Sequence, residues 1–283
     1  MKRILVTGAT GFIGNHVIEE LLQRGYQVMA TSLHESKAAA FPWFSKVDYI
    51  SLNLDRIDAG TDYYAYFKSP DAAIHLAWEG LPNYREAFHI EKNLPAQYAF
   101  LQNLLLNGLP DITVTGTCFE YGMQQGCLSE DMEPAPANAY AIAKDELRKK
   151  IAAITAQNKA GFKWVRLFYM YGKGQSPKSL ISQLDKALQN GDTTFNMSGG
   201  EQERDFLPVE KIASYIVSIA TQNKVTGIIN CCSGSPVKVK TMVQDYLAKQ
   251  HKHIALNLGY YPYADYEPMS FWGDDKKLKT IVQ

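Results

Sequence analysis

The sequence predicts an α/β fold, in which a doubly wound parallel sheet is covered by helices on both faces. Short apolar runs alternate with helix-patterned segments over the first two thirds of the chain, in the order that successive βαβ units produce. The glycines Gly8, Gly11 and Gly14 directly follow the first apolar run. Glycines at a strand-to-helix turn are typical of the Rossmann-type sheets that bind dinucleotides.

The composition excludes several classes of protein. The chain has 283 residues, of which 46% are hydrophobic and 20% charged, and its 29 basic residues balance 29 acidic ones. Because no net charge would attract nucleic acid or a membrane surface, we expect neither as a partner. The apolar run after Met1-Lys2-Arg3 ends at Thr7-Gly8, too soon for a signal peptide, so we expect a cytoplasmic protein. The four cysteines, Cys118, Cys127, Cys231 and Cys232, have neither metal-binding nor disulfide spacing, and we expect reduced thiols and no metal.

The first βαβ unit is predicted from the strand Ile4-Leu5-Val6 and a helical pattern over residues 16–24. The glycine turn lies between them. Glycines let the backbone approach a pyrophosphate closely, and a helix N-terminus offers free N–H groups and the positive end of its dipole. The spacing is GxxGxxG, a variant of the more familiar GxGxxG. We therefore expect this turn to hold a dinucleotide.

Five further buried strands are predicted at residues 26–31, 47–52, 72–77, 112–115 and 164–168, with longer helices at 90–106 and 140–157. Together with the first strand they make six parallel strands joined by crossovers. The last third is mixed, with helices at 180–188, 209–221 and 241–249 and a strand at 227–232. We expect residues 1–171, with a return at about 205–230, to form the dinucleotide-binding Rossmann domain. Residues 172–204 and 231–283 should form a smaller, interwoven α/β substrate-binding lobe.

Tyr140 and Lys144 are candidate proton-transfer residues. Four residues apart on a helix, they share one face. A neighbouring ammonium favours phenolate and lowers a tyrosine pKa from about 10, as proton transfer near neutral pH requires. This spacing is common in helices. Thr117 supports the assignment because it follows the fifth strand at the carboxyl edge of the sheet, where α/β proteins bind ligands.

Taken together, these residues resemble the extended short-chain dehydrogenases/reductases of the NAD-dependent epimerase/dehydratase type, which act on nucleotide-diphosphate sugars. The resemblance covers nearly the whole chain. Besides the glycine turn, Thr117, Tyr140 and Lys144, the matching elements are His75-Leu76-Ala77, Asn93, Arg166, Tyr171-Gly172-Lys173-Gly174, Arg204-Asp205-Phe206, Asn230, Ser233 and Gly234.

The resemblance implies hydride transfer at a sugar carbon. Tyr140 would move the proton of the sugar oxygen, Thr117 would hydrogen-bond the same oxygen, and Lys144 would tune Tyr140 and hold the nicotinamide ribose. Arg204 is the candidate for the substrate diphosphate, with a surface salt bridge as the alternative. A homodimer formed through the helices at 90–106 and 140–157 is also expected.

Departures from the family pattern reduce the number of reactions that this chain could catalyse. Sugar 4,6-dehydratases carry Asp and Glu after the catalytic threonine, where this chain has Cys118 and Phe119. Enzymes that also epimerise C3 and C5 use a cysteine at the position of Phe119 and a histidine near Lys178. Two reactions remain, which are reduction of a 4-keto sugar nucleotide and 4-epimerisation through a transient 4-keto species. Substrate contacts are expected from Trp78, Cys118, Phe119, Tyr169, Lys178 and Arg204.

The end of the second strand favours NADPH over NAD. An acidic residue that would bind the ribose hydroxyls of NAD is missing there, whereas Thr31, Ser32 and Lys37 suit a 2′-phosphate. An epimerase reuses bound NAD, while a reductase consumes hydride, so this difference favours a reductase. The expected cofactor contacts are Gly8, Thr10, Gly11, Phe12, Ile13, Gly14, Thr31, Ser32, Lys37, Asn53, Leu54, Leu76, Ala77, Trp78, Asn93, Tyr140 and Lys144.

We therefore expect an NADPH-dependent reductase of a nucleotide-linked 4-keto-6-deoxy sugar, such as dTDP-4-keto-6-deoxyhexose, in deoxysugar and surface-polysaccharide biosynthesis. The alternatives are a 4-epimerase with bound NAD and a non-catalytic NADP(H)-binding subunit. The segment 78–84 is expected either to close over nicotinamide and sugar or to cap the core through its tryptophan.

Overall fold

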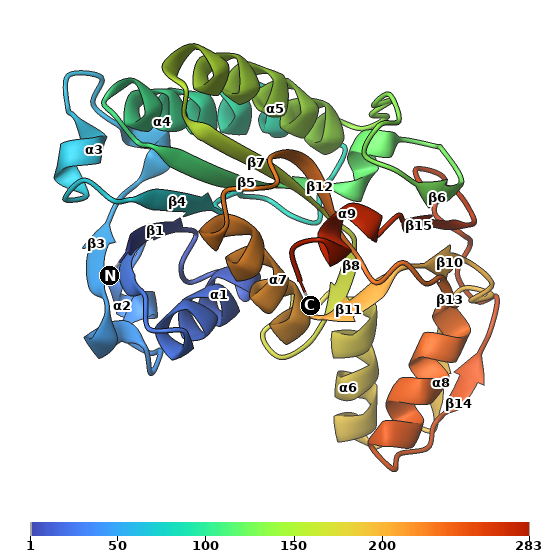
Figure 1. Cartoon of the computed structure of the whole chain (residues 1–283). Coiled ribbons are helices and arrows are strands. Elements are labelled where there is room, and N and C mark those ends of the chain that lie inside the picture. The colour runs from blue at the N-terminus through green and yellow to red at the C-terminus, as the bar shows by residue number, and fades with distance from the viewer. Residues whose placement is uncertain (1, 283) are drawn as a thin grey trace.

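A computed structural model describes residues 2–282, and within them a central sheet of seven strands is parallel throughout (Figure 1). The strand order is β12-β7-β5-β4-β1-β2-β3. The strands are β1 (Arg3–Thr7), β2 (Gln27–Ser32), β3 (Asp48–Ser51), β4 (Ala72–His75), β5 (Asp111–Thr117), β7 (Gly161–Leu167) and β12 (Gly227–Cys231). The predicted Rossmann-type sheet is confirmed, and the strand predicted at residues 227–232 joins it as β12, a seventh strand beside the six expected there. The order reverses beside β1, which places a ligand crevice at the carboxyl ends of β1 and β4.

Helices cover both faces of the sheet. They are α1 (Phe12–Gln23), α4 (Leu94–Leu106), α5 (Ala139–Asn158) and α7 (Val209–Thr221), with the short α2 (Glu35–Ala38) and α3 (Tyr63–Tyr66) near β3 (Figure 1). Along β1, Ile4 and Val6 join one core cluster with α1 and α7, while Leu5 joins another with α4 and α5. This alternation follows from the two-residue period of a strand, and continuous apolar runs are what a sheet buried on both faces requires.

The second lobe holds α6 (Leu180–Asn190), α8 (Val239–Lys249) and short strands around their own core, which includes Leu184, Phe195 and Val243. Its strands pair segments that are distant in sequence. The pairs are β8 (Tyr169–Tyr171) with β11 (Phe206–Pro208), β9 (Thr194–Asn196) with β14 (Ala255–Asn257), β10 (Glu203–Arg204) with β13 (Val237–Lys238), and β6 (Gly126–Leu128) with β15 (Phe271–Gly273), which α9 (Lys276–Lys279) follows. The lobe therefore interleaves with the sheet domain at several points of the chain.

One predicted helix start was wrong, and a second predicted helix opens with a turn of a different type. α1 begins at Phe12, so Gly14 lies inside the helix instead of before it. The helix predicted from residue 90 begins as a π-helical turn, η3 (His89–Asn93), and becomes α4 only from Leu94. Pro95, in the first turn of α4, has no N–H to continue an α-helical ladder from the preceding turn. Across residues 2–282, every helix is too short or too polar to cross a bilayer.

Candidate active site

A cavity of about 290 Å³ lies at the carboxyl ends of β1, β2, β3 and β4. Its lining includes many of the residues predicted to contact a cofactor, namely Gly8, Thr10, Gly11, Thr31, Ser32, Lys37, Asn53, Leu54, Leu76, Ala77 and Trp78. Residues that were not predicted line it as well, namely Leu33, His34, Leu52, Asp55, Glu79 and Gln97. The cavity thus lies where the reversal of strand order places a ligand crevice.

The glycine turn brings bare backbone to this cavity. Gly8 has φ +67°, and a Cβ added to it would lie 2.8 Å from the backbone nitrogen of Ala77. Gly11 is the N-cap of α1 and provides no side-chain hydrogen bond to the free N–H groups of the first turn. Phe12 and Ile13 open the helix. An anion at this helix end would accept hydrogen bonds from those N–H groups and would be stabilised by the positive end of the helix dipole.

Two buried polar atoms indicate that the cavity suits a nucleotide. Thr31 Oγ1 and Gln97 Oε1 both belong to buried residues that line it, and within residues 2–282 neither atom has a hydrogen-bond partner. Buried polar groups without partners are uncommon in native proteins. Hydroxyl and amide groups of a bound dinucleotide would supply such partners. The sequence analysis did not predict Gln97 as a contact, although a glutamine within the apolar pattern of α4 indicates a polar group on a buried helix face.

The rim of the cavity near β2 is basic. His34 and Lys37 line it, and Ser32 exchanges a 2.8 Å hydrogen bond with the hydroxyl of Tyr49. The acidic side chains among the described lining residues, those of Asp55 and Glu79, come from other segments. Both face Lys92, whose Nζ lies 2.7 Å from Asp55 Oδ2 and 3.6 Å from Glu79 Oε2.

Beside this rim, after the neighbouring strand β3, Asn53 caps the short 3₁₀ turn Leu54–Arg56 by accepting a 2.9 Å hydrogen bond from the backbone N–H of Asp55. This cap fixes the turn that presents Leu54 to the cavity.

The three candidate catalytic residues meet beside the cavity. Thr117 is the last residue of β5, while Tyr140 and Lys144 lie near the start of α5, which Asn138 caps. All three are buried. Lys144 Nζ donates a 2.9 Å hydrogen bond to the carbonyl oxygen of Thr115 and lies 6.0 Å from the centre of the Tyr140 ring. The parallel sheet thus brings together groups that the sequence separates by more than twenty residues.

The expected lowering of the Tyr140 pKa was wrong. Burial raises the pKa of Tyr140 well above its ordinary value, and the neighbouring Tyr84 and Glu120 add to this effect, while the Thr117 hydroxyl opposes it. Burial also lowers the pKa of Lys144 to about 7, against the opposing charge of Glu120. Because both groups lie away from water, their uncharged forms are favoured together. The phenol therefore holds its proton at neutral pH.

Trp78 contacts the catalytic pair directly. Its ring centre lies 4.1 Å from Lys144 Nζ and 5.9 Å from the ring of Tyr140, and its indole N–H donates a 3.0 Å hydrogen bond to His89 Nδ1. Asn93 was predicted to contact the cofactor, but it is buried outside the cavity lining and donates a 3.0 Å hydrogen bond to the carbonyl oxygen of Glu79. The π-helical turn directs Asn93 to the loop that follows β4 rather than to the cavity.

Cys118 and Phe119 lie in the turn η4 (Cys118–Tyr121) directly after Thr117, and both are buried. Burial raises the pKa of the Cys118 thiol. Phe119 packs against Tyr84 at 4.9 Å between ring centres and against Tyr169 at 6.4 Å. In contrast, Lys178 is exposed ahead of α6, and its hydrogen bonds within residues 2–282 do not join it to this aromatic cluster.

Arg204 is buried and is already paired within the chain. It is 4% exposed, and its Nε and Nη2 each lie 3.0 Å from Glu267 Oε2. Its Nη1 donates to the carbonyl oxygens of Glu203 and Met269 at 2.8 and 3.1 Å. The same Glu267 oxygen accepts a hydrogen bond from Tyr169. The predicted surface salt bridge is therefore wrong, and a diphosphate would have to compete with Glu267, which sequence reasoning missed.

Comparisons with known proteins agree with this arrangement. The profile of the NAD dependent epimerase/dehydratase family matches residues 4–232. The chain is 28% identical to the dTDP-6-deoxy-L-talose 4-dehydrogenase (NAD(+)) of Aggregatibacter actinomycetemcomitans over 273 residues, covering 95% of this chain and 98% of that protein. It is 24% identical to the GDP-6-deoxy-D-talose 4-dehydrogenase of the same organism, over 86% of this chain and 78% of that protein.

Solved structures resemble the fold along its whole length. MoeE5 in complex with UDP-glucose and NAD matches with a TM-score of 0.80 at 25% identity, over 99% of this chain and 92% of that one. The UDP-N-acetylglucosamine 4-epimerase of Methanobrevibacter ruminantium M1 matches with a TM-score of 0.85 at 20% identity, over 100% and 92%.

Proposed function

Since the chain belongs to the NAD-dependent epimerase/dehydratase family, we propose that it reduces the 4-keto group of a nucleotide-diphosphate-linked 6-deoxy sugar, such as dTDP-4-keto-6-deoxyhexose. The observation that carries the proposal is the buried Tyr140 beside Thr117 and Lys144, next to the cavity that the glycine turn lines. The near full-length similarity to a dTDP-6-deoxy-L-talose 4-dehydrogenase supports C4 as the reacting carbon and a 6-deoxy sugar as the substrate.

NADPH is the proposed hydride donor, and NADH is the alternative. Lys37 at the β2 rim would favour the 2′-phosphate of NADPH, since an ammonium pairs with phosphate oxygens, and His34 lines the same rim. Relatives named above bind or use NAD, so the choice rests on this rim alone.

The nicotinamide cofactor supplies a hydride to the sugar carbon when it is bound. Tyr140 then donates its phenolic proton to the carbonyl oxygen of the substrate, and Thr117 donates a hydrogen bond to the same oxygen. Lys144, beside the phenol, stabilises the phenolate that remains, because an ammonium favours the charged form of a neighbouring phenol. Trp78 and Phe119 cover this region and exclude water from the proton transfer.

The proposal includes a cytoplasmic homodimer and a substrate lobe made of residues 172–204 and 231–283. Apolar side chains that are exposed on the helices expected at the dimer contact, those of Ile90, Leu106 and Ile142, support the dimer. Light scattering of the purified protein tests it, and a monomer mass would contradict it.

The function is tested by mixing the purified enzyme with dTDP-4-keto-6-deoxyglucose and either NADPH or NADH, and following oxidation of the cofactor. We expect faster oxidation of NADPH, a 4-hydroxy product assigned by NMR, and loss of turnover in Tyr140→Phe with little change in NADPH affinity. Inertness with both cofactors, together with C4 inversion of a UDP-hexose, would favour the 4-epimerase. Turnover that survives in Tyr140→Phe would refute the catalytic assignment.

A further inference from the structure

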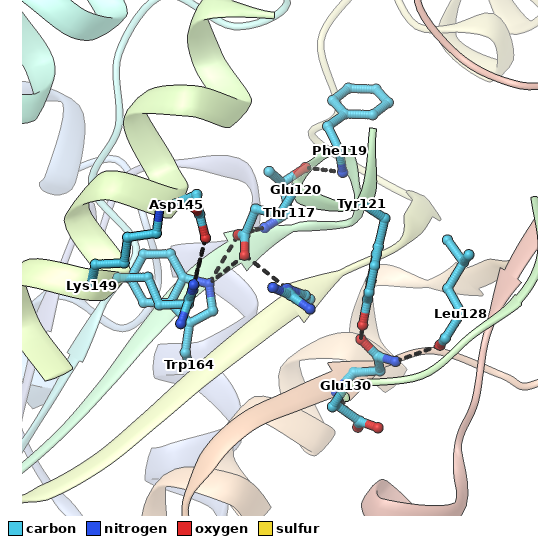
Figure 2. A network of polar contacts seen from close by, with 12 residues as sticks. Thr117, Phe119, Glu120, Tyr121, Leu128, Glu130, Asp145, Lys149 and Trp164 are labelled. Carbon is cyan, nitrogen blue, oxygen red and sulfur yellow. Dashed lines mark hydrogen bonds and ion pairs between the residues drawn. The ribbon is translucent and has the colours of Figure 1, made fainter. Parts of the chain in front are cut away.

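A buried carboxylate lies directly behind Thr117. Glu120 is 0% exposed, and its Oε1 accepts a 2.9 Å hydrogen bond from the backbone N–H of Thr117. The indole N–H of Trp164 donates to both carboxylate oxygens at 2.9 and 3.1 Å, and Arg166 Nε donates to Oε2 at 2.8 Å. Figure 2 shows Glu120 turned toward Thr117 and Trp164. Donors from two neighbouring strands thus fix one carboxylate under the end of β5.

The backbone around Glu120 is shaped to hold it. Thr117 and Glu120 form a capping box for η4, in which the Thr117 hydroxyl accepts a 3.2 Å hydrogen bond from Phe119 N–H. A Cβ on Gly116 would collide with both Trp164 Nε1 and Glu120 Oε1. The absence of a side chain at Gly116 therefore lets the carboxylate and the indole approach the strand that carries Thr117.

Stability alone is a weak reason for this arrangement. Removing a carboxylate and a guanidinium from water is costly, and well-packed apolar residues often serve a core as well or better. Within the described part of the chain, Nη1 and Nη2 of Arg166 are buried without hydrogen-bond partners, and the guanidinium lies 4.3 Å from the centre of the Tyr121 ring. Arg166 therefore bonds Glu120 through a single nitrogen, and much of its own hydrogen-bonding capacity stays unused.

The charge of Glu120 acts on the proposed proton donor. It raises the pKa of Tyr140 and of Lys144, which belong to α5. The other titratable groups that face Glu120 are Arg166 from β7 and, from its own turn, Cys118. Both effects have the same sign, since a fixed negative charge favours protonated neighbours.

We propose that Glu120 is a positioning residue for the reduction, which holds Thr117 against the reacting oxygen and keeps the proton on Tyr140 until the hydride arrives. The inference rests on the proposed function. It predicts that the carboxylate itself, and not only the hydrogen bonds it accepts, is required.

The test compares Glu120→Gln with a matched control, Glu130→Gln. Glu130 also accepts a backbone hydrogen bond, from Asn230 N–H at 2.8 Å, but it lies outside the Thr117 turn. For Glu120→Gln we expect kcat to fall about 10- to 100-fold with KM nearly unchanged. We also expect the alkaline limb of the kcat profile to move to lower pH, because the pKa of Lys144, which is about 7 in the wild type, falls further without the charge of Glu120. The control should match the wild type in both measurements.

An alkaline limb that stays in place in Glu120→Gln would overturn the proposal, even if kcat falls. Because the single variant leaves Arg166 buried without its partner, the double variant Glu120→Gln/Arg166→Met repeats the measurement in a charge-balanced core. In the double variant, an alkaline limb that moves to lower pH supports the proposal, and an alkaline limb that stays in place overturns it.

Amide hydrogen exchange at Thr117 separates this inference from the proposed function, since it needs no turnover. Faster exchange in Glu120→Gln than in Glu130→Gln supports the positioning role even if the wild type reduces none of the sugars. Equal exchange in the two variants overturns that role.

Discussion

Lys144→Met is expected to stabilise the protein while abolishing its proposed activity. Lys144 is 2% exposed, and burial lowers its pKa from 10.5 to about 7. That difference corresponds to a cost of roughly 5 kcal/mol for holding the ammonium in the folded state. That figure already includes the contacts of the ammonium, which donates to Thr115 O and lies over the Trp78 ring. Methionine relieves the cost but also leaves the buried Thr115 carbonyl without its donor and loses contact with Trp78, which together cost about 2–4 kcal/mol. The net gain for the methionine variant is therefore about 1–3 kcal/mol at pH 7.

The pH dependence of this gain identifies its cause. Between pH 7 and about 10, the unfolded wild type binds a proton at Lys144 that the folded wild type has lost, so wild-type stability rises with pH. Below pH 7 both states bind it, and the full cost remains. The advantage of Lys144→Met should therefore be constant below pH 7 and shrink by roughly 1.4 kcal/mol per pH unit above it.

Urea unfolding of both proteins, freed of nucleotide and measured from pH 6 to 9.5, gives this comparison. A methionine variant that is less stable than the wild type at pH 7 would refute the reasoning. So would an advantage that does not change between pH 7 and 9.5, because it would show that packing and not ionisation is responsible.

Three further predictions concern ligand binding. Gly8→Ala should weaken NADPH binding ~10-fold in calorimetry, because the added Cβ strains a residue at φ +67° beside Ala77; an unchanged Kd would show that the turn tolerates a side chain. Glu267→Gln should lower KM for the nucleotide sugar ~3- to 10-fold, because removing the carboxylate charge frees Arg204 for the diphosphate. A raised KM would place Glu267 itself in substrate binding. Lys37→Glu should shift the ratio of kcat/KM values from NADPH toward NADH, and an unchanged ratio would remove Lys37 from cofactor choice.

The sheet and the glycine turn were predictable because their determinants are local. Apolar runs of four to six residues identify buried strands wherever they occur. Because the strands are parallel, all their carboxyl ends lie at one edge of the sheet. Gly8 and Thr117 therefore lie at the same edge, although 109 positions separate them in the sequence. The boundaries were less predictable. The helix after the turn starts at Phe12 because Gly14 can lie inside it, and composition alone does not reveal that.

The surroundings of Arg204 were not predictable because they depend on a distant segment. Its partner Glu267 lies 63 residues further along the chain, in a stretch without regular secondary structure between β14 and β15. An arginine motif predicts an anion, and a carboxylate of the same chain satisfies that chemistry as well as a phosphate does. Only the folded chain distinguishes the two.

The state of Tyr140 shows why proximity alone does not determine a pKa. The spacing of Tyr140 and Lys144 correctly placed them on one helix face, but both side chains are buried, and burial favours the uncharged form of each. Reduction of a ketone needs a phenol that carries its proton, whereas the oxidative half of an epimerase cycle needs a phenolate. Since burial and the charge of Glu120 both favour the protonated phenol, the environment of Tyr140 supports the reductive direction, independently of the basic rim that favours NADPH.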